Sequence, residues 1–132
     1  VQKEVGDRFS AKVGTKDYGS LSIFLNYYFD VRKILDVSRN VFMPKPNVDS
    51  IVVEFCKKKS KIDVLDEKIF FKLVRDSFKQ KRKTIKNNLK DYNLEKIEEV
   101  LLKNNLSLSS RAEQINIDVF AEIANKITKE NI

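Results

Sequence analysis

The sequence contains 132 residues, 42% of them hydrophobic, which is enough for one ordinary domain, or for the end of one domain followed by a small second one. Its 26 basic and 19 acidic residues leave a net charge of +7, which favours nucleic acid as a partner over an anionic membrane surface. The single cysteine excludes an intramolecular disulfide, no apolar run approaches the ~20 residues of a membrane span, and no cleavable signal sequence is recognisable, so we expect a cytoplasmic protein.

The N-terminal part of the sequence predicts a loop and one helix. Residues 1–9 could be the end of a strand that runs into a helical turn, and residues 10–19 contain two of the three glycines, as is typical of a loop. A helix then follows to about Tyr28, because apolar side chains recur at i, i+3, i+4 and i+7. Either Ser20 or Ser22 could cap its N-terminus.

Two strands are predicted next. Residues 30–37 contain enough β-branched side chains for a strand, and the prolines within residues 42–46 exclude regular structure there. Residues 48–56 give the strongest strand signal, with apolar residues on both faces, so we expect this strand to be covered on two sides. Its Cys56 should then be a buried thiol rather than a nucleophile, since the chain has no histidine to activate it.

After a basic linker at residues 57–61, the pattern is helical to the end of the chain. Ser110 and Glu113 match a Ser-x-x-Glu capping box, and Asp118 could start the last helix again after a short break. The predicted helices are residues 67–90, 94–104 and 110–129. Strands therefore precede residue 57 and helices follow it, which predicts an α+β chain.

The first predicted helix separates apolar from basic side chains. At 100° per residue from Phe70, the apolar residues fall between roughly 0° and 100° and the cations between roughly 120° and 220°, with no carboxylate inside the basic arc. Such a stripe could be a solvated face or a dock for an acidic protein, but it also suits an RNA phosphate backbone, which reads no sequence. The cations predicted to bind RNA are Lys72, Arg75, Lys79, Arg82, Lys83, Lys86 and Lys90.

No catalytic apparatus is recognisable in the sequence. The glycines are too far apart for a phosphate-cradling loop, there is no histidine, and one cysteine cannot form a metal cluster. One stiff segment remains, in which two prolines present Phe42 beside Lys45. Phe42 could stack on an unpaired base, or it could simply fill the core beside the following strand.

Several short segments match motifs of a known enzyme family. They are Gln2-Lys3-Glu4-Val5 with Arg8, Tyr18-Gly19-Ser20-Leu21-Ser22, Phe42-x-Pro44-x-Pro46-x-Val48-Asp49-Ser50, Phe78-Lys79-Gln80-Lys81-Arg82-Lys83-Thr84 with Asn88-Leu89, and Arg111-Ala112-Glu113-Gln114. In this order, over nearly the whole chain, they resemble the KsgA-type small-subunit (16S) rRNA adenine dimethyltransferases, relatives of the erythromycin-resistance rRNA methylases. The second and last segments look more like the ribosome-biogenesis branch than the resistance branch.

The resemblance implies a Rossmann-like methyltransferase domain followed by a small all-helical domain. Residues 1–57 would be the terminal strands of the first domain, and residues 58–132 the helical RNA-binding domain. In the family, the donor-binding glycine motif and the Asn-Leu-Pro-Tyr-type catalytic motif precede the position that matches Val1. We therefore expect a C-terminal portion with no S-adenosylmethionine site, no catalytic residue and no methyltransferase activity of its own.

The resemblance also implies a substrate and partners. The family uses S-adenosylmethionine to methylate two adjacent adenines in a hairpin loop near the end of small-subunit rRNA, so the expected partner is this rRNA in an immature small ribosomal subunit. The family's proline-motif Phe borders the target-base pocket, which supports stacking by Phe42 with Lys45 beside it. Unpaired strand edges predict self-association of the chain. The alternative is a stand-alone basic helical nucleic-acid-binding module.

Overall fold

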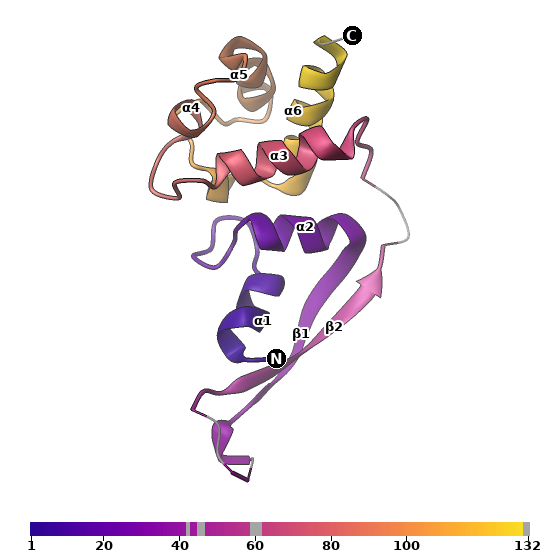
Figure 1. Ribbon diagram of the computed structural model, residues 1–132, viewed down its shortest axis with the longest axis vertical. Helices are drawn as coiled ribbons and strands as arrows, with labels where there is room; N and C mark the ends of the chain where they lie inside the picture. The colour runs from indigo at the N-terminus through magenta and orange to yellow at the C-terminus, as the bar shows by residue number, and fades with distance from the viewer. Residues whose placement is uncertain (42, 45–46, 59–61, 131–132) are drawn as a thin grey trace. The chain divides into compact units, whose positions relative to one another are not determined.

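A computed structural model describes residues 1–41, 43–44, 47–58 and 62–130 of the chain (Figure 1). The backbone forms two compact units, Val1–Lys61 and Ile62–Ile132. The boundary expected from composition, after residue 57, lies near the end of the first unit. The first unit contains strands and helices and the second contains helices, so the chain is α+β, as predicted.

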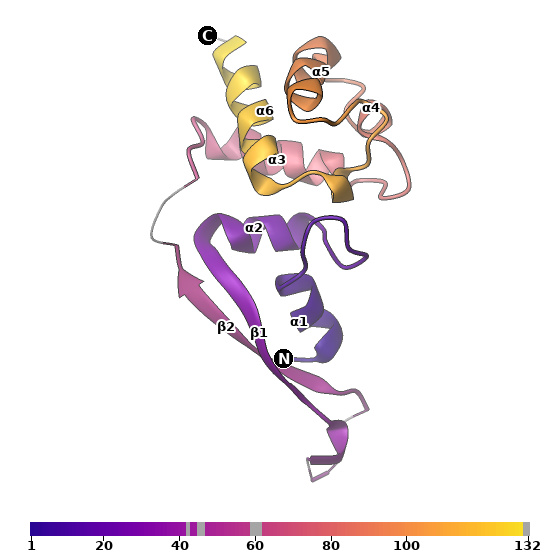
Figure 2. The ribbon, with the colours of Figure 1, turned by 180° about the vertical axis from the view of Figure 1, so that it is seen from behind.

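The first unit packs two helices against a two-stranded antiparallel sheet (Figures 1 and 2). Both predicted strands are present, whereas the N-terminal residues form a helix with a single bridge from Gln2 to Ser50. In chain order the elements are α1 (Lys3–Phe9), α2 (Ser20–Tyr28), β1 (Phe29–Val37), a 3-10 turn (Arg39–Val41) and β2 (Ser50–Lys57).

The two faces of this sheet differ in chemistry. The register pairs Val31 with Phe55 on the face toward α1, where the Phe55 ring lies 5.9 Å from the ring of Phe9. On the opposite face Arg32 is paired with Glu54, and their side chains form an ion pair at 2.9 Å. A strand that carries a hydrated ion pair on one face is not buried on both, so the prediction that residues 48–56 are covered on two sides is wrong.

The two faces explain part of the exposure along β2. Ile51 is buried against α1, whereas Val52, on the face of the ion pair, keeps 45% of its surface exposed. Phe55, although it is on the α1 face, is 43% exposed. Cys56 is exposed, and its thiol donates to the carboxylate of Glu54 at 3.1 Å. The predicted buried thiol is therefore also wrong, because Cys56 lies on the polar face of the strand.

The start of α2 is fixed by a serine inside the helix. Gly19, rather than Ser20 or Ser22, occupies the N-cap position, and its N–H donates to Ser22 Oγ at 3.2 Å. The hydroxyl of buried Ser22 in turn donates to the carbonyl of Arg8 at 2.6 Å, which ties α2 to the end of α1. The predicted helix is present, but neither predicted serine is its N-cap.

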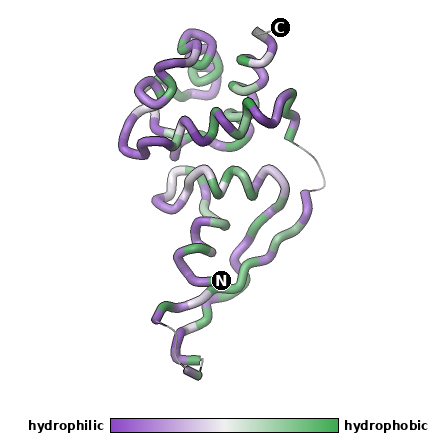
Figure 3. Tube along the Cα trace, viewed as in Figure 1, coloured by the Kyte–Doolittle hydropathy of each residue, from purple (hydrophilic) through white to green (hydrophobic). Residues whose placement is uncertain are grey.

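The second unit consists of helices joined by turns. In Figure 3 hydrophilic and hydrophobic positions alternate along α3 and α6, as expected of helices with one buried side. α6 packs against both α3 and α5. The elements are α3 (Glu67–Ser77), α4 (Ile85–Asn88), α5 (Leu94–Lys103), a 3-10 turn (Ala112–Gln114) and α6 (Ile117–Glu130).

The core of the second unit draws on every one of these helices. The ring of Phe78, just after α3, lies 6.0 Å from the ring of Phe120 on α6. Fully buried side chains of this unit include Phe70, Leu73, Val74, Ile85, Leu89, Ile97, Leu101, Ile115, Phe120 and Ile123. Burial of this apolar surface is the main force that holds the helices together.

The predicted continuous helix over residues 67–90 is wrong, because α3 ends at Ser77 and α4 begins only at Ile85. Thr84 caps α4 by accepting an N–H from its first turn at 3.4 Å. The break allows the side chains of Ile85 and Leu89 to enter the core, while the basic residues between the two helices stay on the surface.

The start of α6 differs in detail from the prediction. Asn116, rather than Asp118, caps the helix by accepting the N–H of Val119 at 2.9 Å. Ser110 does not begin a helix; its hydroxyl accepts the N–H of Ser107 at 3.1 Å. No helix in the described part of the chain combines the length and apolar character needed to cross a bilayer.

Candidate nucleic-acid interface

Several cations of the first unit are compensated by carboxylates of the same unit. The ion pairs are Arg8–Glu4 at 3.0 Å, Arg32–Glu54 at 2.9 Å, Lys33–Asp36 at 3.1 Å and Lys58–Asp30 at 2.9 Å. Each pair cancels a positive charge that would otherwise attract an anion. The first unit therefore presents less positive charge than its lysine and arginine content suggests.

Residues 79–90 differ, because every charged side chain in this segment is positive. Among the residues described, no carboxylate forms an ion pair with Arg82, Lys83 or Lys86. Like charges this close repel one another unless solvent or an anion screens them, so the segment is suited to a polyanion. Its cations, all exposed, are Lys79, Lys81, Arg82, Lys83, Lys86 and Lys90.

Two backbone hydrogen bonds hold this segment against a distant loop. The N–H of Ile85 donates to the carbonyl of Ser110 at 2.8 Å, and the N–H of Lys86 donates to the carbonyl of Leu108 at 3.0 Å. The first amides of a helix have no acceptor within the helix itself. At the start of α4 these two carbonyls of the distant loop accept from them instead. The same bonds bring Arg111, the neighbour of Ser110, beside the cations of the segment.

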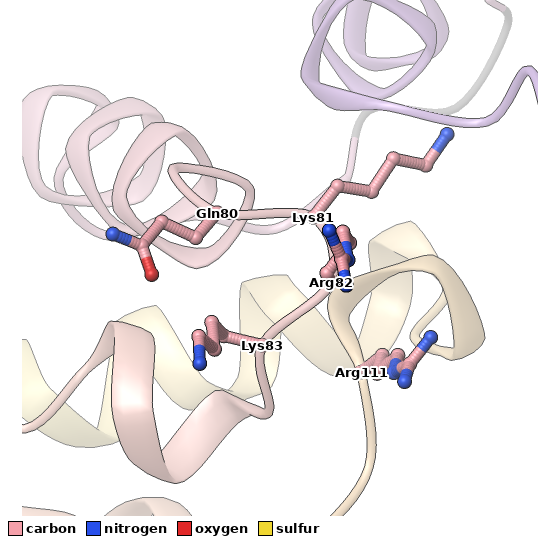
Figure 4. Close-up of a pocket in the computed structure, with 5 residues that line it drawn as sticks. All are labelled: Gln80, Lys81, Arg82, Lys83 and Arg111. Atoms are coloured by element: carbon pink, nitrogen blue, oxygen red, sulfur yellow. The ribbon is translucent and has the colours of Figure 1, made fainter.

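An open pocket of about 450 Å³ lies where the two segments meet, lined by Gln80, Lys81, Arg82, Lys83 and Arg111 (Figure 4). Its charged lining is entirely positive. In Figure 4 Lys81 extends away from Arg82 and Arg111. Two guanidinium groups offer planar sets of N–H donors that match phosphate oxygens, so the pocket is suited to a phosphodiester group. It offers neither a nucleophile nor an acid–base pair.

Sequence reasoning missed two of the four cations that line this pocket. Lys81 falls on the apolar side of a continuous helix, and that helix does not form. Arg111 is far away in sequence, and nothing in its local spacing predicts its position. Its proximity depends on the bond between Ile85 and Ser110. The only available signal is that Arg111 belongs to one of the segments that resemble a family motif.

Lys72 has a partner within the chain. Its ammonium group lies 2.9 Å from the Asp76 carboxylate and 5.2 Å from the centre of the Tyr92 ring, and the Tyr92 hydroxyl donates to the same carboxylate at 2.6 Å. Burial alone would raise the pKa of Asp76, but hydrogen bonds from Tyr92 and Lys72 outweigh it and lower that pKa. The hydrogen bond to Asp76 raises the pKa of Lys72. The two groups are therefore oppositely charged at neutral pH.

A second pocket, of about 440 Å³, lies between α5 and α6, and its charged lining is three lysines and two glutamates. Lys103 pairs with Glu122 at 3.0 Å, and Lys126 pairs with Glu99. Because carboxylates match two of its three lysines, this pocket is less suited to a polyanion than the pocket beside Arg82. Within the described ranges there is also no group of three or more cysteine, aspartate or glutamate side chains that could hold a metal ion.

The cations predicted to form one helical stripe lie on several pieces of backbone, because α3 ends at Ser77. Their contact with RNA remains a prediction. Phe42 and Lys45, predicted to contact the target base and RNA, lie outside the described residues. Residues 78–84 join α3 to α4 and are called the connecting segment below. Of the predicted cations, Lys72 and Arg75 lie on α3, Lys79, Arg82 and Lys83 on the connecting segment, Lys86 on α4, and Lys90 just after α4.

Comparison with protein families gives a match over almost the entire chain. Residues 1–129 match the model of the family described as "Ribosomal RNA adenine dimethylase". The chain is 46% identical to the protein named "Ribosomal RNA small subunit methyltransferase A" from Bacillus cytotoxicus and 44% identical to the protein of the same name from Bacillus mycoides. Each match extends over 96% of this chain. The match covers 46% of each relative, so the chain spans about half the length of the curated relatives it matches.

Two solved structures resemble the chain. A dimethyladenosine transferase from Plasmodium falciparum superposes with a TM-score of 0.77 at 25% identity, over 99% of this chain and 56% of the other. The 23S rRNA methyltransferase ErmE superposes with a TM-score of 0.72 at 16% identity, over 96% of this chain and 52% of the other, which is a likeness of fold.

Proposed function

The chain belongs to the ribosomal RNA adenine dimethylase family, and we propose that it is the RNA-holding part of an S-adenosylmethionine-dependent rRNA adenine dimethyltransferase. The proposed substrate is a pair of adjacent adenines in small-subunit rRNA, presented on an immature small ribosomal subunit. The names of the Bacillus relatives support the choice of the small subunit.

One observation carries the RNA-binding role: Arg82, Lys83 and Arg111 are exposed cations, and no carboxylate in the described part of the chain forms an ion pair with them. A cation that neutralises a phosphate releases condensed counterions, and this release supplies affinity without reading sequence. We therefore assign RNA-backbone contacts to Arg82, Lys83 and Arg111, with Lys79 and Lys86 beside them. Their role is to position the RNA, and base selection belongs elsewhere.

The first unit is proposed to be the end of a Rossmann-like catalytic domain. Support comes from its two strands and from the match of residues 1–129 to the family. The proline segment between β1 and β2 is proposed to carry the contacts to the target base, with Phe42 stacking on an extruded adenine. Lys45 would supply a nearby phosphate contact.

The methyl donor is proposed to be held by another part of the enzyme. Neither described pocket fits S-adenosylmethionine: the pocket beside Arg82 is lined by cations and a glutamine, and carboxylates of the α5–α6 pocket are paired with lysines. The glycines at residues 6, 14 and 19 are also too far apart for a glycine-rich nucleotide-binding turn. We therefore assign no step of methyl transfer to the residues of this chain.

The test compares two double variants that remove equal charge. Arg82→Gln/Arg111→Gln should weaken binding to a small-subunit rRNA hairpin about tenfold at ~0.1 M salt, and should lower the slope of log K against log salt by about 1.5. Lys103→Gln/Lys126→Gln should change affinity less than about twofold, because both lysines are engaged by glutamates. Fluorescence anisotropy with labelled RNA measures both quantities.

Two outcomes would contradict the proposed function. Equal losses in the two variants would mean that only net charge matters. A shallow salt dependence for RNA, together with tighter binding to an acidic protein, would instead favour a protein-docking surface.

A further inference from the structure

One carboxylate beside the cations of the second unit forms an ion pair with Lys72, and its charge also acts on Lys79. The Asp76 carboxylate accepts hydrogen bonds from Lys72 Nζ at 2.9 Å and from the Tyr92 hydroxyl at 2.6 Å. Lys72 Nζ also lies 3.4 Å from the Tyr92 oxygen and over the Tyr92 ring. The ammonium group is thus held by an anion on one side and an aromatic ring on another.

The stability of α3 does not by itself account for this arrangement. Asp76 is in the last turn of the helix, where the macrodipole disfavours a negative charge. The order of the pair, with Lys72 four residues before the acid, is also the weaker of the two i,i+4 orientations. The ion pair, whose side chains keep 65% and 31% of their surface exposed, contributes little to folding. The bond from Tyr92 to Asp76 stabilises the fold but does not need the lysine, so the pairing of Lys72 points to a role on the surface.

We propose that Lys72, although its place in the sequence predicts an RNA contact, is withheld from the RNA backbone by Asp76, which limits the sequence-independent affinity of the cations around α3 and α4. This inference rests on the proposed function. The Lys72 side chain is 65% exposed and precedes Arg75 on the same helix, so without Asp76 it would be available to a phosphate. The Tyr92 hydroxyl holds the carboxylate in place, which keeps the lysine occupied.

A withheld cation lowers the general affinity of the surface for RNA without changing its preference among RNAs. Each phosphate contact tightens binding to every RNA alike, whereas the fit of a folded rRNA depends on several contacts at defined positions. Removing one general contact therefore weakens unrelated RNA in the same proportion and keeps its absolute affinity low.

The test is Asp76→Asn, which removes the charge and retains an oxygen that can accept from Tyr92. We expect this variant of the chain to bind both a small-subunit rRNA hairpin and an unrelated RNA about threefold to tenfold more tightly at ~0.1 M salt. The slope of log K against log salt should steepen by about 0.7 to 0.9, which corresponds to one additional phosphate contact. Thermal unfolding of each variant verifies that it is folded.

A double-mutant cycle assigns the gain to Lys72. Lys72→Gln should change RNA affinity less than about twofold in the otherwise unaltered chain, and it should abolish the gain in the Asp76→Asn background. Asp91→Asn is the matched control, because Asp91 is exposed, follows Lys90 and forms no ion pair in the described part of the chain. It removes the same charge without releasing a lysine, so its gain should stay below about twofold.

The outcomes separate this inference from the function on which it rests. If the unaltered chain binds RNA without a steep salt dependence, the proposed function fails. If the unaltered chain binds as proposed but Asp76→Asn binds no more tightly, the inference is overturned. It is equally overturned if Asp91→Asn gives the same gain, or if the gain survives Lys72→Gln.

Discussion

The side-chain amide of Asn88 donates a hydrogen bond to the carbonyl oxygen of Ser77 at 2.9 Å. The same amide donates to the carbonyl of Gln80 at 3.0 Å. The first carbonyl belongs to the last residue of α3 and has no partner within its own helix. One side chain on α4 therefore satisfies the end of α3 and fixes the start of the basic connecting segment.

Replacing Asn88 with alanine should destabilise the second unit. The partly buried Ser77 carbonyl would lose its donor, so we expect the free energy of unfolding to fall by about 1 to 3 kcal/mol. Asn87→Ala is the control, because Asn87 is exposed and alanine is a better helix former; its effect should stay within about 0.5 kcal/mol. Urea unfolding measures both, and equal effects would show that Asn88 does not anchor the segment.

Several elements were predictable because their signals are local. The pair of strands follows from β-branched runs on either side of a proline segment, and α5 follows from its own apolar periodicity. The end of α3 at Ser77 was not predictable in this way, since no glycine or proline occurs in the segment that follows. The break depends on Asn88 and on the bond from Ile85 to Ser110, which are contacts between separate segments.

The candidate interface was predictable in part for the same reason. A run of cations without carboxylates is visible in the sequence, so most of its residues were identified. Arg111 was not, because its position depends on a backbone bond from a residue far away in the sequence. Burial of β2 was misjudged because apolar residues such as Val52 look the same in sequence whether their face is covered or carries an ion pair beside it.

Gly6 should tolerate no side chain, although it lies within a helix. A Cβ atom at this position would come 2.3 Å from Cδ1 of Ile51, a fully buried residue with little freedom to move. Gly6→Ala should therefore destabilise the first unit by about 1 to 3 kcal/mol, despite the higher helix propensity of alanine. Lys3→Ala, on the exposed side of the same helix, should be neutral in the same urea titration. A stabilised Gly6→Ala variant would contradict the packing described between α1 and β2.

Phe120 is expected to be a main source of stability in the second unit. Its side chain is fully buried and lies against the ring of Phe78. Phe120→Ala should lower the free energy of unfolding by about 3 to 5 kcal/mol, and Phe120→Leu by a smaller amount that leaves the unit folded. Leu102 is 60% exposed, so Leu102→Ala should change stability by less than about 0.5 kcal/mol. Thermal unfolding followed by circular dichroism gives the comparison, and a Leu102 effect as large as that of Phe120 would be inconsistent with this core.

The phenol of Tyr92 should make stability depend on pH in the alkaline range. Burial, and then the hydrogen bond to Asp76, raise the pKa of Tyr92 from 10.0 to about 12. The folded chain therefore holds this proton more tightly than the unfolded chain does. The resulting stabilisation is complete below about pH 10 and is lost as the pH rises toward 12. Between about pH 9 and about pH 11, the unaltered chain should thus lose more stability than Tyr92→Phe in urea titrations.

The Asp76→Asn variant is a second check on the same phenol. It removes the negative charge that opposes ionisation of Tyr92, so the pKa of Tyr92 should fall toward its ordinary value. Absorbance of the phenolate, taken as the difference between each chain and its Tyr92→Phe counterpart, isolates this one tyrosine. An unchanged titration in Asp76→Asn would mean that burial alone sets the pKa of Tyr92, and that the bond to Asp76 contributes little to it.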